Sequence, residues 1–201
     1  MRTVNIAEHA WRLRCILNTA CTLLAHQGYA ATSMDQIATA CRLKKASLYH
    51  YFRSKQQLLH DLIQLRLRET HPAHFNPRHG RDLQKAFFEL GMKYLAGLKR
   101  RQNREFLELL VRDSFNDPFV RQVFFKAMQS RVREGTQALA GLGISGSRRR
   151  SYVMGMHQFM NALVRYALET RIWGSATAGP FQDREYIGCL AKIFACGFAR
   201  L

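Results

Sequence analysis

Lysines, hydroxyl groups and aromatic rings gather in one short stretch, residues 33–55, whose sequence is SMDQIATACRLKKASLYHYFRSK. Lysines and hydroxyls bind phosphates, short side chains let a helix approach another surface closely, and rings give a rigid scaffold. The pattern predicts two short helices joined by a tight turn, and the second helix carries these groups. Such a helix suits a groove of DNA.

A strong positive charge accompanies this stretch. The 201 residues hold 31 Lys and Arg against 14 Asp and Glu, a formal net charge of +17. The net charge is +6 over residues 1–55, +1 over 56–79 and +10 over 80–201. A chain this basic is drawn to polyanions, nucleic acid above all. The charge of 80–201 could equally form a solvated surface that aids solubility.

Helical periodicity positions this stretch within a chain that we expect to be all-α. Ser33 and Gln36 match a capping box, which satisfies two backbone donors at a helix start. Gly28 stands where a glycine ends a helix, and Asp117 followed by Pro118 is typical of a helix start. The apolar spacing predicts about nine helices, at about 9–28, 33–41, 44–51, 55–70, 81–101, 104–115, 118–140, 148–173 and 183–201.

The segment 71–80, HPAHFNPRHG, is the best candidate for a domain boundary because it holds two of the four prolines. We therefore expect a helix-turn-helix domain at 1–55, the head, which extends into the fourth helix to about 79. A larger helical domain, the body, follows at 80–201. Asp183 is expected to cap its last helix.

Several function classes lack their sequence signatures. No apolar run approaches the ~18 residues of a membrane span, and the N-terminus has no signal-peptide core, so we expect a cytoplasmic protein. The motifs G-x-S-x-G, P-loop, HExxH and DxD are absent, so we expect no enzyme, no cofactor and no metal site. The irregular spacing of His71, His74 and His79 favours polar linker residues over metal ligands.

The five cysteines form no CxxC pair, which argues against a zinc site or a disulfide framework. They fit small buried hydrophobic residues better. Cys189 and Cys196 are seven residues apart on one predicted helix face. A redox-sensing regulator is therefore kept as an alternative.

The head resembles the TetR family of bacterial transcriptional repressors over about residues 16–59. Two positions depart from the family: Arg42 stands where the turn usually has glycine, and Lys44 where Ser or Thr usually caps the third helix. A positive φ at Arg42 would cost on the order of 1 kcal/mol, and the cap at Lys44 would be weaker. The anchor positions of the resemblance are Ile16, Leu17, Ala20, Leu23, Gly28, Tyr29, Ala31, Thr32, Ser33, Ile37, Ala38, Leu43, Leu48, Tyr49, Phe52, Ser54, Lys55, Leu58 and Leu59.

The resemblance implies a sequence-specific regulator of transcription, a repressor that a small, largely apolar ligand releases from a palindromic operator. An activator, or a binder of nucleic acid without sequence preference, is the alternative. Thr32 is expected to donate to a phosphate and Lys55 to pair with one. The residues expected to reach base edges are Lys44, Ser47 and His50. The other expected DNA contacts are Ser33, Lys45, Tyr49 and Tyr51.

By the same resemblance, the body forms a homodimer and binds the ligand. Ligand binding is expected to pull the fourth helix and to spread the two heads. The expected dimer stripe, which could equally be intrachain core, comprises Tyr152, Met156, Met160, Leu163, Ile187, Leu190, Phe194 and Phe198. The aromatic residues expected near the ligand are Phe87, Phe88, Tyr94, Phe106, Phe115, Phe124, Phe125, Phe159 and Tyr166.

Overall fold

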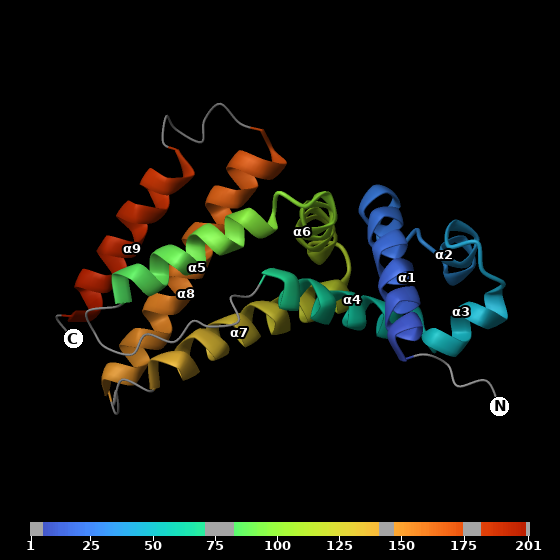
Figure 1. Cartoon of the computed structure of the whole chain (residues 1–201), viewed down its shortest axis with the longest axis horizontal. Helices are drawn as coiled ribbons and strands as arrows, with labels where there is room; N and C mark the ends of the chain where they lie inside the picture. The colour runs from blue at the N-terminus through green and yellow to red at the C-terminus, as the bar shows by residue number, and fades with distance from the viewer. Residues whose placement is uncertain (1–5, 71–82, 141–146, 175–181, 200–201) are drawn as a thin grey trace. The chain divides into compact units, whose positions relative to one another are not determined.

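Nine α-helices and one short π-helix make up the part of the chain that the structure describes (Figure 1). The computed structural model describes residues 6–70, 83–140, 147–174 and 182–199. These ranges contain no strand, so the predicted all-α fold is confirmed. The expected boundary at 71–80, with its three histidines, lies outside the described residues.

The chain divides into two compact units, and each is built from two stretches of sequence. The first unit comprises Met1–Leu67 and Arg101–Phe125, and the second comprises Arg68–Arg100 and Lys126–Leu201. The head therefore packs with a segment that the sequence pattern alone assigned to the body.

The first unit joins the four N-terminal helices to α6 and to the start of α7. Within it, α1 lies between α2 and α6 (Figure 1). The helices are α1 (Ile6–Gln27), α2 (Met34–Ala40), α3 (Lys45–Tyr51), α4 (Lys55–Thr70), α6 (Arg101–Ser114) and α7 (Pro118–Ala140). Its fully buried side chains include Leu24, Ile37, Leu48, Phe52, Leu58, Leu62 and Leu109. These buried apolar residues form the core of the first unit.

Local signals begin and end the helices of the first unit as predicted. Gly28 has a φ of +93°, a conformation that glycine adopts without a Cβ penalty. The Ser33 hydroxyl accepts from the Gln36 N–H at 3.2 Å, and the Gln36 side chain accepts from the Ser33 N–H at 2.7 Å, which completes the capping box. The Asp117 carboxylate accepts from the N–H groups of Phe119 and Val120, at 2.8 and 3.0 Å, and so caps α7.

The second unit is built on the close packing of α5 against α9. Its elements are α5 (Leu83–Gly97), the later part of α7, α8 (Ser147–Ala167), the π-helix η2 (Leu168–Ile172) and α9 (Asp183–Ala199). A Cβ at Gly91 would lie 2.6 Å from a methyl group of Ile187, so the two helices approach at this glycine. The rings of Phe87, Phe159 and Phe194 cluster nearby, with centroids 4.7 to 6.3 Å apart. This aromatic cluster holds α5, α8 and α9 together.

Most of the expected dimer stripe lies in the core of the second unit. Tyr152, Met156, Met160, Leu163 and Ile187 are at most 7 % exposed. Leu190 and Phe194 are half-buried, and the side chain of Phe198 is outside the described part of the chain. These five buried residues pack within the protomer, and a Cβ at Gly91 of α5 would lie 2.6 Å from Ile187 and 3.3 Å from Leu163.

Asp183 is the first residue of α9 and does not cap it through its side chain. The Gln182 carbonyl accepts from the N–H groups of Glu185 and Tyr186, each at 3.0 Å, so the helix is entered one residue earlier. The Asp183 carboxylate instead accepts from the Tyr166 hydroxyl at 3.2 Å and pairs with Arg171 of η2. This contact ties the start of α9 to the end of the α8 segment.

Candidate nucleic-acid interface

The turn between α2 and α3 is a Schellman motif with an arginine at the position that favours glycine. Arg42 has a φ of 55°, in the left-handed region. The Arg42 N–H donates to the Thr39 carbonyl at 2.9 Å, and the Leu43 N–H donates to the Ala38 carbonyl at 2.8 Å. These two hydrogen bonds hold Arg42 in a conformation that costs a non-glycine residue on the order of 1 kcal/mol. The turn keeps its shape although Arg42 departs from the family pattern.

The short helix α3 presents its polar groups outward and is anchored by Leu48. Lys44 precedes the helix in extended conformation and makes no side-chain capping hydrogen bond, as expected. Lys44, Lys45 and His50 are exposed and Ser47 is half-buried. Leu48 is fully buried, so it fixes which face of the helix reaches solvent. Cations, a hydroxyl and an imidazole thus lie together on one short, firmly seated helix.

The aromatic residues of α3 fall into two kinds. Tyr49 is 41 % exposed, so its ring and hydroxyl are accessible to a partner. Tyr51 is half-buried and stacks on His9 of α1, with ring centroids 5.2 Å apart. Tyr49 therefore suits the expected DNA contact better than Tyr51 does.

Lys45 forms an ion pair across the turn. Its ammonium lies 2.8 Å from a carboxylate oxygen of Asp35, and both side chains are exposed. The hydrogen bond to Asp35 raises the pKa of Lys45. Exposed ion pairs are weak, so a phosphate can compete with Asp35 for this lysine.

Thr32 and Ser33 use their hydroxyls within the protein. Thr32 is only 1 % exposed, and its hydroxyl donates to the Gly28 carbonyl at 2.7 Å. Contrary to expectation, the hydroxyl hydrogen of Thr32 is directed inward in this arrangement. Ser33 is exposed, and its hydroxyl oxygen accepts the capping hydrogen bond. Of the two hydroxyls, that of Ser33 is therefore the more accessible from outside the protein.

Lys55 holds the link between α1 and α2. Its ammonium donates to the Tyr29 carbonyl at 2.7 Å and to the Thr32 carbonyl at 2.8 Å. It also lies 4.4 Å from the centroid of the Tyr29 ring. Burial lowers the pKa of Lys55, and the nearby charge of Asp117 acts in the opposite direction. A phosphate contact by Lys55 therefore has to compete with two internal carbonyl acceptors.

Two adjacent residues of α6 also hold the link between α1 and α2, and neither was among the predicted site residues. The Asp113 carboxylate accepts from the Tyr29 N–H at 2.5 Å and from the Arg112 guanidinium at 2.6 Å. Arg112 also donates to the carbonyls of Ala25 and Leu24, at 2.6 and 3.1 Å, near the end of α1. These partners are 84 or more residues apart in sequence, so no local spacing signals the contact.

The Tyr29 side chain is enclosed as firmly as its backbone. Its ring stacks on Phe119 of α7, with centroids 5.9 Å apart. Burial, with a smaller contribution from the charge of Asp117, raises the pKa of Tyr29 to about 12. We name the set of Lys55, Arg112, Asp113 and Phe119 the link clamp, because all four hold the segment between α1 and α2.

The nine aromatic residues expected near a ligand do not form one set. Phe106, Phe115, Phe124 and Phe125 belong to the first unit and the other five to the second. Phe87, Tyr94, Phe159 and Tyr166 are buried as core, and Phe88 lies under the Arg184 guanidinium. Phe115 and Phe125 are 77 % and 56 % exposed. A groove between α7 and α8, described below, contains none of the nine.

Comparison with known proteins identifies the head. Residues 16–62 match the model of the family described as bacterial regulatory proteins, tetR family. Over this segment, the chain is similar to the TetR family. The predicted resemblance over residues 16–59 is therefore confirmed, with Arg42 and Lys44 inside the matched segment.

Two curated relatives are similar to a short segment of this chain. A 43-residue segment is 44 % identical to IcaR of Staphylococcus aureus (strain Newman), a negative transcriptional regulator of the biofilm operon icaADBC. A 50-residue segment is 40 % identical to YuxN of Bacillus subtilis (strain 168), an uncharacterized HTH-type transcriptional regulator. The matches span 21 % and 25 % of this chain but only 23 % of IcaR and 17 % of YuxN.

Solved structures of TetR-type proteins share the fold over nearly the whole chain. The flavonoid-responsive regulator FrrA is 22 % identical with a TM-score of 0.66, covering 95 % of this chain and 96 % of that one. AibR in complex with isovaleryl coenzyme A and operator DNA is 20 % identical with a TM-score of 0.61, covering 90 % and 97 %. A putative TetR-family regulator from Syntrophomonas wolfei is 13 % identical with a TM-score of 0.70, covering 95 % and 96 %. Because these identities are below 25 %, the likeness shows the fold alone.

The described residues add two findings on other function classes. None of the described helices is both long and apolar enough to cross a membrane. Within the same ranges, no cluster of three or more His, Cys, Asp or Glu side chains could hold a metal ion.

Proposed function

We propose that this chain is a sequence-specific DNA-binding regulator of transcription that represses by occupying an operator. The observation that carries the proposal is the short helix α3, which exposes Lys45, Tyr49 and His50 and is anchored in the core by Leu48. Lys44 is exposed directly before it. Lysines and hydroxyls would hold phosphates, and side chains at the helix start would read base edges in the major groove. The TetR-type relatives, among them the negative regulator IcaR, support the same assignment.

The test is fluorescence anisotropy with a labelled fragment of the protein's own promoter, titrated with unlabelled random DNA. The expected result is that random DNA competes at least about 100-fold less effectively than the promoter fragment. His50→Ala should reduce this preference because it removes a base contact, and Gln64→Ala, at an exposed position of α4, is the matched control. Equal competition by random DNA would show a binder without sequence preference.

A homodimer would bring two copies of α3 to a palindromic operator, with centres about 34 Å apart. Since most of the predicted stripe is core, the proposed interface moves to the exposed faces of α8 and α9. These faces include Met154, 66 % exposed, and Ile193, 60 % exposed. Ile193→Asp should dissociate the dimer in light scattering without unfolding the protomer. Lys93→Asp, at an exposed position of α5, is the control, and a dimer that survives Ile193→Asp places the interface elsewhere.

Release from DNA by a small ligand completes the proposal. AibR forms a complex with isovaleryl coenzyme A and operator DNA, and FrrA is flavonoid-responsive, which supports a ligand-binding role for the body of this chain. A ligand that binds the DNA-incompetent arrangement more tightly shifts the population of dimers toward it. The ligand would then lower operator affinity in the anisotropy assay.

A further inference from the structure

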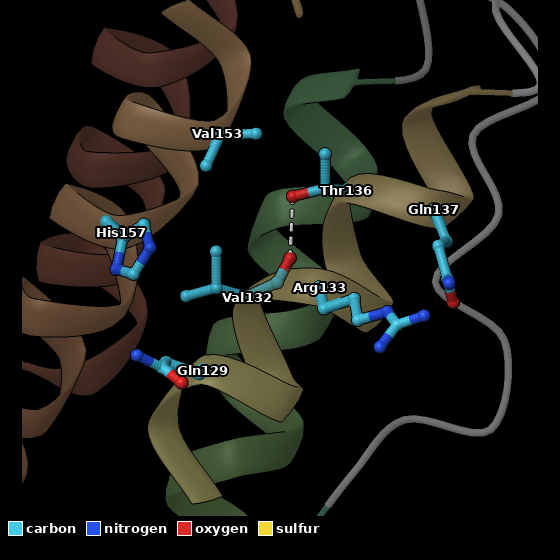
Figure 2. A pocket seen from close by; sticks show the side chains of 7 residues that line it. All are labelled: Gln129, Val132, Arg133, Thr136, Gln137, Val153 and His157. Carbon is cyan, nitrogen blue, oxygen red and sulfur yellow. Dashed lines mark hydrogen bonds between the residues drawn. The ribbon is translucent and has the colours of Figure 1, made fainter. Parts of the chain in front are cut away.

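A groove of about 330 Å³ runs between α7 and α8 of the second unit (Figure 2). Val132 and Thr136 of α7 form its buried floor, and Val153 of α8 adds a half-buried apolar wall. Three exposed α7 side chains and one exposed α8 side chain form the rim: Gln129, Arg133, Gln137 and His157. The α7 residues follow helical spacing, so one face of α7 lines the groove along two turns.

The chemistry of the rim is cationic and donor-rich. None of the seven lining residues is a carboxylate, and one is an arginine. Among the described residues, no Asp or Glu forms an ion pair with Arg133, whereas Arg165 and Arg171 of the same unit are each paired. The Thr136 hydroxyl hydrogen is used by the Val132 carbonyl, at 2.6 Å, so the floor offers no hydroxyl donor. The donors that can meet a ligand are therefore on the rim, above an apolar floor.

Figure 2 shows how these donors are distributed. His157 and the Gln129 amide lie on the α8 side of the groove, and the Arg133 and Gln137 side chains extend from α7 on the other side. Arg133 is exposed, and its long flexible stem lets the guanidinium turn toward an anion held at the rim. A bound anion would order this side chain.

We propose that the groove binds a small amphipathic monocarboxylate. The Arg133 fork would hold the carboxylate through two parallel hydrogen bonds, which is the geometry that a guanidinium and a carboxylate share. The hydrocarbon chain would lie on Val132 and Val153. The volume is near the lower end of ligand pockets, about 300–1,000 Å³, so the ligand is small. The inference rests on the proposed function only in treating the body as the ligand domain.

The test uses octanoate and octanamide as probes of the full-length protein by isothermal titration calorimetry. The two molecules have the same chain and nearly the same shape and differ in charge. Octanoate should bind at least about tenfold more tightly than octanamide, because only the anion pairs with Arg133. Equal affinities, or no heat of binding with octanoate at about 1 mM, would overturn the proposal.

Two variants test whether octanoate binds in this groove. Arg133→Gln keeps much of the side-chain length and removes the charge, so it should weaken octanoate binding at least about tenfold and leave octanamide unchanged. Lys192→Gln removes one charge from an exposed position of α9 outside the groove and should leave both affinities unchanged. Circular dichroism melts show whether either variant is misfolded. If Arg133→Gln leaves the octanoate affinity unchanged, the carboxylate does not bind Arg133 in this groove and the proposal is wrong.

This experiment tests the groove separately from the proposed function, because the calorimetry involves no DNA. Operator binding without octanoate binding would leave the regulator intact and dismiss the groove. Octanoate binding without sequence-specific DNA binding would leave the groove and dismiss the regulator.

Discussion

Lys55→Met separates an internal role of this lysine from a phosphate contact. Methionine keeps the unbranched stem and removes the ammonium that donates to the Tyr29 and Thr32 carbonyls at 2.7 and 2.8 Å. A charged donor contributes about 1.5–3 kcal/mol per buried hydrogen bond, and a cation over a ring about 0.5–1 kcal/mol. Because Lys55 is only half-buried, we discount these values for solvent screening and expect a loss of about 2 kcal/mol. For a chain of this length, that loss lowers the melting temperature by about 4–8 °C.

The assay combines a thermal melt, followed by circular dichroism, with operator affinity measured at several salt concentrations. Lys45→Met is the matched variant, because Lys45 is exposed and bound only by an exposed Asp35. It should leave the melt nearly unchanged and reduce the salt slope by about 0.9, the value for one phosphate. If Lys55→Met leaves the melting temperature unchanged and reduces the salt slope by about one, Lys55 is a phosphate contact and the internal role is refuted.

Three further predictions follow from particular contacts. Gly91→Ala should cost about 1–3 kcal/mol in urea unfolding because the added Cβ lies 2.6 Å from a methyl group of Ile187, while Gly197→Ala, with nothing within 4 Å, should not destabilise. Tyr29 has its pKa raised to about 12, above the ~10 of an unfolded tyrosine, so its contribution to stability is intact below pH 10 and is lost as the pH rises from about 10 to 12. Tyr29→Phe should remove one late-titrating phenol at 295 nm, and an unchanged titration would contradict this. Lys44→Ser should add about 1 kcal/mol of stability through a new cap and should weaken operator binding, and a melt that does not rise would show that the cap is not formed.

The sequence predicted those features that depend on residues close together in the chain, such as the ends of helices. The capping box at Ser33, the glycine at Gly28 and the cap at Asp117 each involve groups within about four residues of one another. The same locality made Arg42 identifiable, because the Schellman turn requires a positive φ whatever residue occupies it. The family resemblance of the head depends on such positions, and it was confirmed over the same segment.

Contacts between distant segments could not be predicted in this way. Periodicity showed that α8 and α9 have apolar stripes, but it could not show whether Ile187 faces a partner or α5. Only the close approach at Gly91 decides that it faces α5. In the same way, the sequence around a lysine at the start of a helix does not show whether its ammonium binds a phosphate or a backbone carbonyl. Lys55 finds its acceptors 23 and 26 residues earlier in the chain.

The link clamp enlarges what must be counted as the DNA-binding head. The segment matched by the family, residues 16–62, contains Lys55 but not Arg112, Asp113 or Phe119. Yet the buried Tyr29 N–H has its acceptor on Asp113, and α2 begins only five residues after Tyr29. A buried backbone donor without its acceptor is costly in free energy. The position of the start of α2 therefore depends on α6. The position of α3 on DNA therefore depends on α6 and on the start of α7, which the family match to the head does not include.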